Sequence, residues 1–219
     1  MVSVYFLSLG RKKRGVCALA VANFSDFREE RIREYLSDSE LDRLRSIQLE
    51  KRQREYVLGR LTTKMALASL TNNLKFRDVS VLNEASGSPV IRAPLDHGDY
   101  GTSIAHTDEI VVSLVFQREF SFGIDIENLG RKSRSALKYI ARGGETIPED
   151  SESSMVAWTL KESLGKALKC GLRCPEELVL AQLQRKDSVF FCSYRKHPEF
   201  GGIARIYGNY SLAITYPLG

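Results

Sequence analysis

The chain has 219 residues, of which 43% are hydrophobic and 27% are charged. This composition is typical of a folded globular protein and excludes a disordered or fibrous one. Lys and Arg exceed Asp and Glu by 32 to 27, for a net charge of +5, which favours acidic partners. No apolar run approaches the roughly 20 residues that span a bilayer, and the N-terminus lacks the pattern of a signal peptide, so we expect a cytoplasmic protein without a membrane partner.

The cysteines do not suggest a metal site. They are Cys17, Cys170, Cys174 and Cys192, none of them in a C-x-x-C pair, and the chain has only three His. This argues against structural zinc. We expect four buried free thiols.

Several segments of the first half show strand patterns. Alternating apolar residues at 2–6 predict a strand, and residues 16–21 predict a second strand that pairs with it. Residues 87–89, Gly-Ser-Pro, indicate a turn. Apolar runs at 110–116 and 120–126 predict two further strands joined as a hairpin.

A long helical region is expected after the first two strands. Ser37 and Glu40 have the spacing of a capping box, and apolar residues at helical spacing then continue to residue 70. Basic side chains lie between the apolar positions, notably Arg54, Arg60 and Lys64. They form either an ordinary solvated face or a set of phosphate contacts.

The second half repeats the order of helix first and strands after. Helices are predicted at 135–142 and at 154–169, the latter ended by Gly171. Strands are predicted at 179–183, 189–194, 203–207 and 210–216. The order of elements in the two halves predicts an α+β fold with two similar lobes.

Two carboxylates lie near the middle of the chain. Asp125 and Glu127 alternate with Ile124 and Ile126, so the period of a strand places both acids on one face. Adjacent carboxylates repel unless a cation lies between them, and Mg²⁺ takes such oxygen ligands. The pair is either a magnesium site or a solvated strand end.

The predicted helix at 154–169 contains a second polar cluster. Trp158, Glu162 and Lys166 fall on one stripe, with Lys161 beside it. Glu162 can supply a third carboxylate or accept the proton of an attacking hydroxyl, and the two lysines can neutralise phosphate oxygens. The alternative is an exposed helix with a Glu–Lys pair across one turn.

His106 precedes the predicted strand at 110–116. Because no Ser or Cys nucleophile motif accompanies it, His106 is expected to donate to a phosphate rather than act as a catalytic base. Otherwise it is a surface histidine.

These motifs, in this order, resemble those of the 4′-phosphopantetheinyl transferases, specifically the large monomeric, surfactin-synthetase-activating type. Residues 123–127, Gly-Ile-Asp-Ile-Glu, are similar to the family's G-I-D-x-E. Residues 158–163, Trp-Thr-Leu-Lys-Glu-Ser, with Lys166, are similar to its W-x-x-K-E-[AS]-x-x-K. Weaker similarity extends over residues 36–40, 56–60, 87–89 and 104–106.

The resemblance implies a pseudo-dimer of two α+β lobes within one chain, with coenzyme A and Mg²⁺ in the cleft between them. The N-terminal lobe would span residues 1–117, on the coenzyme A side. The C-terminal lobe would span residues 118–219 and hold the metal-binding and catalytic motifs.

The resemblance also implies a role for each candidate residue. The metal ligands would be Asp125, Glu127 and Glu162, and the catalytic residues Glu162, Lys161 and Asp125, with Glu162 activating the attacking serine. Lys161 and Lys166 would contact the pyrophosphate. His106 would bind the 3′-phosphate of coenzyme A, and Arg54 or Arg60 would contact a further phosphate.

The implied activity is a Mg²⁺-dependent transfer of 4′-phosphopantetheine from coenzyme A to a serine hydroxyl of an acyl or peptidyl carrier protein. It releases adenosine 3′,5′-bisphosphate and serves fatty acid, polyketide or nonribosomal peptide biosynthesis. An acidic carrier protein would be attracted by the basic net charge. We expect the enzyme to be a monomer.

Two alternatives stay open. A non-catalytic relative would bind a carrier protein or coenzyme A without transfer, and it is favoured by Ser88 and Ala105, which stand where many family members have Lys and Ser. A nucleic-acid-binding module would account for the basic helix. However, no nucleic-acid recognition motif is present, and nucleic acid gives no reason for three carboxylates, so we expect no nucleic-acid partner.

Overall fold

The computed structural model describes residues 2–10, 15–94, 98–130 and 150–219, which fall into two compact units. The N-terminal unit comprises the described residues within 2–8 and 15–120. The C-terminal unit comprises the described residues from 121 onward, together with residues 9–10. The helix expected at 135–142 lies outside the described residues.

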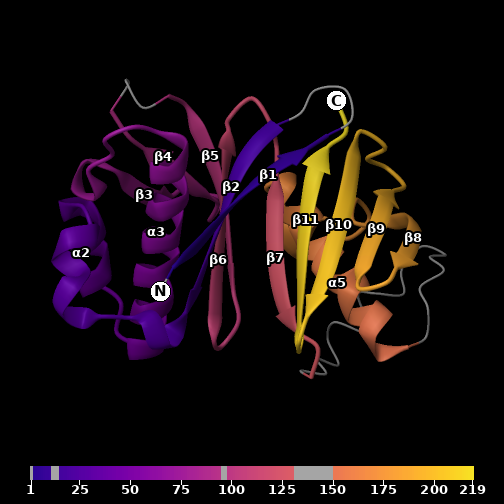
Figure 1. Ribbon diagram of the computed structural model, residues 1–219, viewed down its shortest axis with the longest axis horizontal. Coiled ribbons are helices and arrows are strands. Elements are labelled where there is room, and N and C mark those ends of the chain that lie inside the picture. Colours follow the sequence, from indigo (N-terminus) through magenta and orange to yellow (C-terminus); the bar gives the residue numbers. More distant parts are fainter. Residues whose placement is uncertain (1, 11–14, 95–97, 131–149) are drawn as a thin grey trace. The chain divides into compact units, whose positions relative to one another are not determined.

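The N-terminal unit is built on a six-stranded antiparallel sheet with the order β1-β2-β6-β5-β4-β3 (Figure 1). Its strands are β1 (Ser3–Leu9), β2 (Gly15–Asn23), β3 (Ser80–Asn83), β4 (Pro89–Arg92), β5 (Tyr100–His106) and β6 (Ile110–Gln117). Its α-helices are α1 (Ile32–Tyr35), α2 (Asp38–Arg45) and α3 (Glu50–Leu70), with short 3-10 turns η1 (Phe24–Asp26), η2 (Glu29–Arg31) and η3 (Phe76–Asp78). The predicted pairing of the first two strands is confirmed.

The expected helical region is divided into two helices. The capping box is confirmed, because the backbone N–H of Ser37 donates to Glu40 Oε2 (2.8 Å) and the backbone N–H of Glu40 donates to Ser37 Oγ (3.4 Å). After α2, the hydroxyl of Ser46 donates to the carbonyl of Arg43 (2.7 Å), a local bond that competes with helix continuation. The chain then restarts as α3, which packs on β2, β5 and β6.

The interpretation of Arg60 and Lys64 as part of a solvated basic face is wrong, because both are buried. Lys64 Nζ donates to Glu40 Oε2 (2.5 Å) and to the carbonyls of Tyr35 (2.8 Å) and Phe76 (2.9 Å). Burial lowers the pKa of Lys64, and the charge of Glu40 opposes that shift. The buried cation is tolerated because its ammonium group is hydrogen-bonded and paired.

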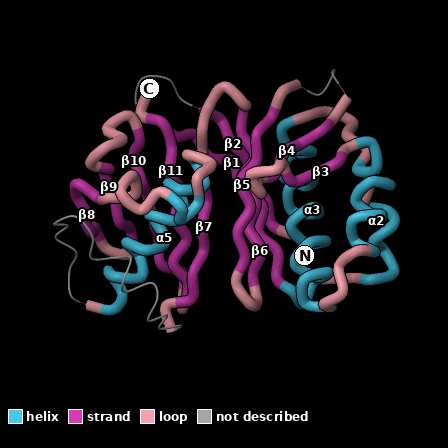
Figure 2. The backbone as a smooth tube through the Cα atoms, turned by 180° about the vertical axis from the view of Figure 1, so that it is seen from behind, coloured by secondary structure: helices cyan, strands magenta, loops and turns pink. Residues whose placement is uncertain are grey.

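The C-terminal unit is built on a five-stranded antiparallel sheet with the order β7-β11-β10-β9-β8. Its strands are β7 (Gly123–Asn128), β8 (Leu180–Lys186), β9 (Val189–Tyr194), β10 (Phe200–Tyr207) and β11 (Tyr210–Pro217). Helix α5 (Ser151–Ala167) is followed by a 3-10 turn, η5 (Gly171–Arg173). Figure 2 shows α5 lying across one face of this sheet, where it packs on β7, β10 and β11.

The hairpin expected between residues 110–116 and 120–126 is not formed. β6 pairs with β2 and β5, whereas β7 pairs with β11 in the other sheet, with Ile124 opposite Ile214. The first four residues of β7 are buried. The alternation of residues along a strand sets which side chains share a face but not which strand lies beside it, so pattern alone could not assign the partner of β7.

The two units share one topology. In each, a strand precedes a long helix, four antiparallel strands follow, and the last strand pairs with the first: β2, α3 and β3 to β6 in one unit, β7, α5 and β8 to β11 in the other. Each helix is joined to the last strand by a hydroxyl pair. The Thr62 and Ser113 oxygens lie 2.6 Å apart, and those of Ser163 and Thr215 lie 2.7 Å apart. The expected α+β class with two similar lobes is confirmed.

The expectation of four free thiols is corrected by the structure. Cys170 and Cys174 form a disulfide just after α5, where the turn of the chain brings their Cα atoms to 6.1 Å, within the usual range. Cys17 and Cys192 are free and buried, and burial raises the pKa of each thiol to about 12.

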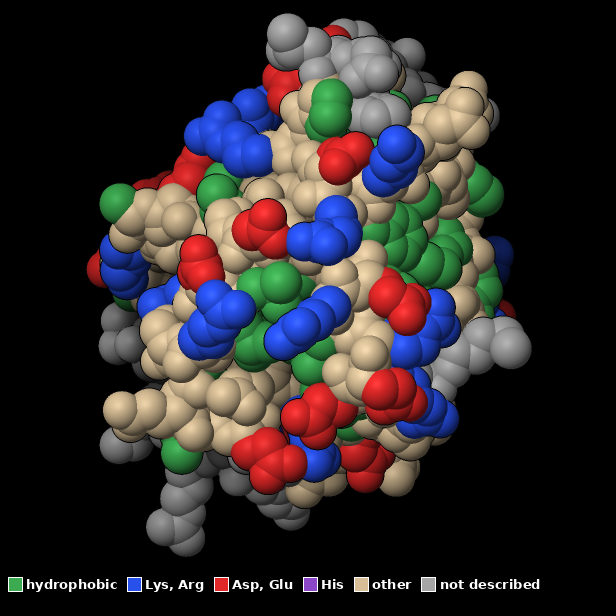
Figure 3. Space-filling model, turned by 90° about the vertical axis from the view of Figure 1, so that its left-hand side faces the viewer, with side chains coloured by type: hydrophobic (Ala, Val, Ile, Leu, Met, Phe, Trp, Pro, Cys, Tyr) green, Lys and Arg blue, Asp and Glu red, His purple; other side chains and the backbone are tan. Residues whose placement is uncertain are grey.

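The basic side chains on one face of the N-terminal unit are mixed with acidic ones. On the face at the left of Figure 1, basic and acidic side chains alternate rather than forming one basic field (Figure 3). Exposed pairs in this unit include Arg45–Asp42 (2.6 Å) and Arg77–Asp38 (2.7 Å). No helix among the described residues is long and apolar enough to cross a membrane.

Candidate functional site

Gly123, at the start of β7, allows α5 to approach the strand closely. A Cβ atom at this position would lie 1.8 Å from the carbonyl oxygen of Ser163 and 2.7 Å from the backbone nitrogen of Ala167. No side chain fits there, so glycine is required by packing. The close approach places the polar stripe of α5 beside the acidic residues that follow Gly123.

Both acidic side chains of β7 have partners on α5. Lys166 Nζ lies 2.7 Å from Oδ1 of Asp125, and the Asp125 carboxylate is almost fully buried. The indole Nε1 of Trp158 donates to Oε1 of Glu127 at 3.2 Å. The predicted stripe of Trp158, Glu162 and Lys166 therefore faces β7, and the alternative of an exposed helix is wrong.

Glu162 lies between these two contacts along the stripe. Burial, reinforced by the negative charges of Asp125 and Glu127 and opposed by Lys166, raises the pKa of Glu162 to about 7. Three carboxylates are thus close enough to influence one another electrostatically. A carboxylate whose pKa lies near neutrality is suited to accepting a proton at physiological pH.

Lys161 occupies the position next to Glu162 and is buried, with 4% of its surface exposed. The C-terminal unit thus contains three carboxylates and two lysines within one strand and one helix. Lys166, which is 27% exposed, is the lysine that the structure shows beside these carboxylates, so it can contact a phosphate oxygen next to a base.

The carboxylates of Asp125, Glu127 and Glu162 are oxygen ligands of the kind that a hard divalent cation prefers. Burial is the main cause of the raised pKa of Glu162, and the charges of Asp125 and Glu127 add to it, so a cation bound among these carboxylates would oppose the shift. Within the described residues, however, no three His, Cys, Asp or Glu side chains are already arranged to hold a metal ion. Lys166 supplies the positive charge beside Asp125.

His106, at the end of β5, has a partner that the sequence did not reveal. Its Nδ1 lies 3.8 Å from Oε1 of Glu55 on α3, and the other oxygen of Glu55 accepts from Nη1 of Arg52 at 2.8 Å. The Arg52–Glu55 pair has helical spacing and could have been found in the sequence. Its link to His106, 51 residues away from Glu55, could not.

Arg54 and Arg60, the two arginines expected to contact phosphate, have their contacts with residues other than His106. Arg54 pairs with Glu50 and lies over the ring of Phe27 at 5.8 Å. Arg60 is buried and donates to the carbonyl of Val81 (3.2 Å) and to Asn83 Oδ1 (2.7 Å). Arg60 therefore anchors β3 to α3, and Arg52 is the arginine linked to His106 through Glu55.

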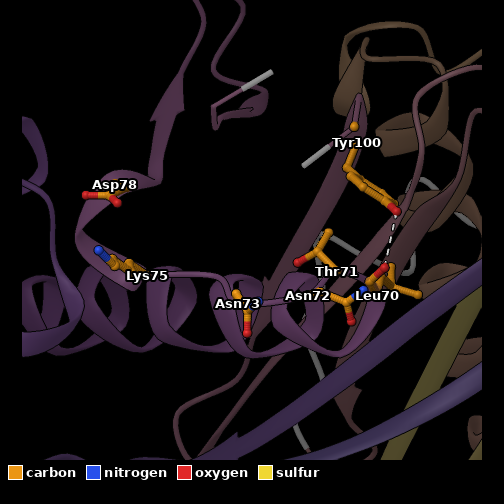
Figure 4. A pocket seen from close by; sticks show the side chains of 8 residues that line it. Leu70, Thr71, Asn72, Asn73, Lys75, Asp78 and Tyr100 are labelled. Atoms are coloured by element: carbon orange, nitrogen blue, oxygen red, sulfur yellow. Dashed lines mark hydrogen bonds between the residues drawn. The ribbon is translucent and has the colours of Figure 1, made fainter. Parts of the chain in front are cut away.

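Two surface cavities lie elsewhere in the N-terminal unit. One of about 690 Å³ is at the C-terminal end of α3, where Tyr100 Oη donates to the carbonyl of Leu70 at 3.4 Å (Figure 4). A second, of about 420 Å³, is lined by Phe24, Glu50, Lys51, Arg54 and Asp108. Of the candidate site residues, only Arg54 lines either cavity.

Comparison with protein families gives two matches along the chain. Residues 43–116 match the 4′-phosphopantetheinyl transferase N-terminal domain. Residues 121–215 match the 4′-phosphopantetheinyl transferase superfamily. Together the two ranges take in well over half of the chain, and the second contains both β7 and α5.

A relative is the holo-(acyl-carrier-protein) synthase of Exiguobacterium sibiricum, which is 34% identical over 87 residues. The match covers 37% of this chain and spans 66% of that relative's length.

Two solved structures of holo-(acyl-carrier-protein) synthases were also matched. That of Bacillus anthracis, in complex with CoA (3′,5′-ADP), has a TM-score of 0.42 and 19% identity, over 46% of this chain and 92% of the other. That of Thermotoga maritima has a TM-score of 0.40 and 23% identity, over 60% and 74%.

The two family matches follow one another along the chain as the two units do. The first contains α3 and His106, and the second contains the acidic strand β7 and the polar stripe of α5. The chain therefore belongs to the 4′-phosphopantetheinyl transferase superfamily, with the family's N-terminal domain in its first half and the superfamily domain in its second.

Proposed function

We propose that this protein transfers the 4′-phosphopantetheine group of coenzyme A to a serine hydroxyl of an acyl or peptidyl carrier protein. Family membership supports the proposal, and so does the similarity to the holo-(acyl-carrier-protein) synthase of Exiguobacterium sibiricum. The main structural support is that Lys166 and Glu162 of α5 lie against Asp125 and Glu127 of β7. A base and a phosphate-binding cation thus share one small site.

In the proposed reaction the serine oxygen attacks the β-phosphorus of coenzyme A. A new phosphorus–oxygen bond forms, the bond from that phosphorus to the bridging oxygen breaks, and adenosine 3′,5′-bisphosphate leaves. Glu162 accepts the serine proton, a role for which a pKa of about 7 is suitable. Lys161 and Lys166 offset charge on the pyrophosphate oxygens, because catalysis of such transfer depends mainly on alignment and electrostatics.

A Mg²⁺ ion would be held by Asp125, Glu127 and Glu162. When bound, it would neutralise negative charge on the pyrophosphate. Lys166 and Trp158 keep the acidic cluster in place, because Lys166 pairs with Asp125 and the indole of Trp158 donates to Glu127. The N-terminal unit would contribute His106 as a ligand of the 3′-phosphate.

The proposal includes the expected partners and state of the protein. An acidic carrier protein is the partner favoured by the net charge of +5. We propose a monomer of the large type, since one chain contains both family domains. We also propose that it acts in the cytoplasm. Size-exclusion chromatography with light scattering tests the monomer.

The experiment is intact-mass spectrometry of several apo carrier proteins after incubation with this protein, coenzyme A and Mg²⁺. The expected result is a gain of one phosphopantetheine group that disappears with a chelator and with Asp125→Ala. A carrier whose acceptor serine is replaced by Ala is the control for the site of attachment.

The non-catalytic alternative predicts a different result. If the folded protein bound coenzyme A but modified no carrier, the transferase proposal would be wrong, and Ser88→Lys with Ala105→Ser would be the substitutions to test next. These positions are where the chain departs from the family pattern on the coenzyme A side.

A further inference from the structure

The link between Glu55, Arg52 and His106 in the N-terminal unit has no role in the reaction described above. Glu55 is on the buried side of α3, with only 7% of its side chain exposed, whereas Arg52 is 63% and His106 is 37% exposed. One buried carboxylate thus contacts two exposed, potentially cationic side chains, one through each of its oxygens. The two side chains come from different elements, α3 and β5.

We propose that Glu55 is a positioning residue that holds Arg52 and His106 as a two-point site for a phosphate monoester, the 3′-phosphate of coenzyme A. This rests on the proposed function and adds two residues to it. Arg52 would contact the phosphate directly. Glu55 would set the preference for coenzyme A over 3′-dephospho-coenzyme A without touching either.

The contacts leave donors available for such a ligand. Arginine has five N–H donors in a planar fork suited to phosphate. Arg52 donates to Glu55 through Nη1. His106 faces Glu55 with Nδ1, so Nε2 is the ring nitrogen on the other side. At 3.8 Å this is an ion-pair distance rather than a hydrogen bond, and it sets which side of the ring faces the carboxylate.

A second ion pair ties the same two elements together. Lys51 Nζ on α3 lies 2.6 Å from Oδ1 of Asp108, two residues beyond His106. The first turns of α3 are thus tethered at two points, to the end of β5 and to the residues that follow it. This matters because a site displaced by about 1 Å loses much of its effect on binding or rate.

Glu55 has two opposing effects on a bound phosphate. Its negative charge repels the phosphate, while its contacts restrict an arginine whose side chain is otherwise flexible. Because Glu55 is buried beneath the two donors and each of its oxygens contacts one of them, we expect positioning to prevail. The two effects predict opposite results when the charge of Glu55 is removed, so the proposal can be tested directly.

The chain offers a matched control. Arg45 and Asp42 on α2 form an ion pair with the same three-residue spacing as Arg52 and Glu55, but both side chains are more than 70% exposed. Asp42→Asn and Arg45→Ala remove the same charges from the same unit without affecting the proposed site.

The first readout is equilibrium binding by isothermal titration calorimetry, which does not depend on turnover. The probes are adenosine 3′,5′-bisphosphate and adenosine 5′-monophosphate, which differ only in the 3′-phosphate. Wild type should bind the bisphosphate more tightly. Glu55→Gln and Arg52→Ala should each weaken bisphosphate binding roughly tenfold or more, because hydrogen bonds to charged groups change binding constants by that factor. The affinity of Arg52→Lys for the bisphosphate should lie between those of wild type and Arg52→Ala.

The second readout is the kinetics of transfer. Glu55→Gln should raise KM for coenzyme A by a similar factor, leave kcat within roughly threefold, and leave kcat/KM for 3′-dephospho-coenzyme A unchanged, the pattern of a lost uniform-binding contact. A merely structural defect would lower kcat/KM for both substrates and the affinity for both adenosine probes alike. Thermal unfolding of each variant identifies such a defect.

Three results would overturn the proposal. The first is equal affinity of wild type for the two adenosine probes. The second is a preference for the bisphosphate over the monophosphate that is unchanged in Glu55→Gln. The third is a stronger preference for the bisphosphate in Glu55→Gln, which would mean that Glu55 only repels the phosphate. If wild type transfers phosphopantetheine but the variants keep its preference, this inference alone fails. If wild type modifies no carrier yet shows a preference that depends on Glu55, the transferase proposal fails and the phosphate site stands.

Discussion

The indole nitrogen of Trp158 lies 3.2 Å from Oε1 of Glu127, so a tryptophan side chain is hydrogen-bonded to one of the three carboxylates of the candidate site. Trp158 is the only Trp in the chain. Any change in the charge or position of Glu127 therefore acts on the single source of tryptophan emission. The protein has an intrinsic reporter at the place where a metal ion is proposed to bind.

We predict that Mg²⁺ changes the tryptophan emission in a saturable manner in the absence of coenzyme A and carrier. A cation at the three carboxylates would change the field at the indole and the Glu127 contact. The measurement is emission excited at long wavelength, to avoid tyrosine, with Na⁺ at matched ionic strength as the control. Asp125→Asn, which leaves the indole contact in place, should weaken the response, and an identical response in that variant would argue against the assigned ligands.

Glu162→Gln is predicted to reduce turnover by about 10²- to 10⁴-fold, the range attributed to a positioned base. Coenzyme A binding should change far less, because the substitution keeps the size of the side chain. The measurement compares kcat with the dissociation constant from calorimetry. Glu152→Gln is the control, since Glu152 lies on the same helix but pairs with Arg185 at the surface. Wild-type turnover in Glu162→Gln would remove Glu162 from the mechanism.

Gly123→Ala should destabilise the protein by roughly 1–3 kcal/mol or more, because α5 must move away from β7 to admit a Cβ atom. Activity should fall as well, since the shift separates Glu162 and Lys166 from Asp125. The control is Gly59→Ala in α3, where the nearest side-chain atom is Ile104 Cγ2 at 3.4 Å. Alanine is favoured in a helix interior, so this variant should gain up to about 1 kcal/mol. Chemical denaturation measures both, and equal stabilities would contradict the packing argument.

Lys64→Met should cost roughly 3–5 kcal/mol, because it leaves the buried carboxylate of Glu40 without its cation. Adding Glu40→Gln should recover part of the loss, as expected for two residues whose effects are coupled. Lys51→Met breaks an exposed pair with Asp108 and should cost less than about 1 kcal/mol. Urea denaturation of the set distinguishes a buried pair from an exposed one, and similar losses for both lysines would count against the assignment.

Asp150 should make the stability of the protein depend on acid pH. Its carboxylate accepts from the backbone N–H of Ser153 at the start of α5 (2.8 Å), and this bond lowers the pKa of Asp150 below its usual 3.8. A lowered pKa means that the stabilisation is present above about 3.8 and is lost as pH falls through the lower, folded-state value. Asp150→Ala should cost about 1 kcal/mol at neutral pH, with a smaller penalty at pH 3, and a penalty independent of pH would contradict this reading.

The local parts of the candidate site could be predicted from the sequence. The two acids of β7 share a face because of the period of a strand, and Trp158, Glu162 and Lys166 share a stripe because of the period of a helix. That these two faces meet was implied by resemblance to a family, since periodicity carries no information about which element packs on which. In the structure the two faces meet because Gly123 has no side chain and α5 can therefore pack directly on the backbone of β7.

The errors arose where long-range contacts override local pattern. Arg60 and Lys64 have the spacing of an exposed basic stripe, yet both are buried because residues of β3, η3 and α2 satisfy their donors. The pairing expected for β7 is wrong because alternation fixes which side chains of a strand share a face but not which strand lies beside it. The partner of His106 was missed because Glu55 is distant in sequence.

The shared topology of the two units allows their positions to be compared one by one. Thr62 and Ser163 are each the thirteenth residue of their helix, and each bonds the last strand of its own sheet. Counting from these anchors, Ala22 corresponds to Asp125, Leu61 to Glu162 and Met65 to Lys166. At these equivalent positions the C-terminal unit has ionisable side chains and the N-terminal unit has apolar ones. One repeated topology thus carries a polar cluster in one unit and only apolar contacts at the same places in the other.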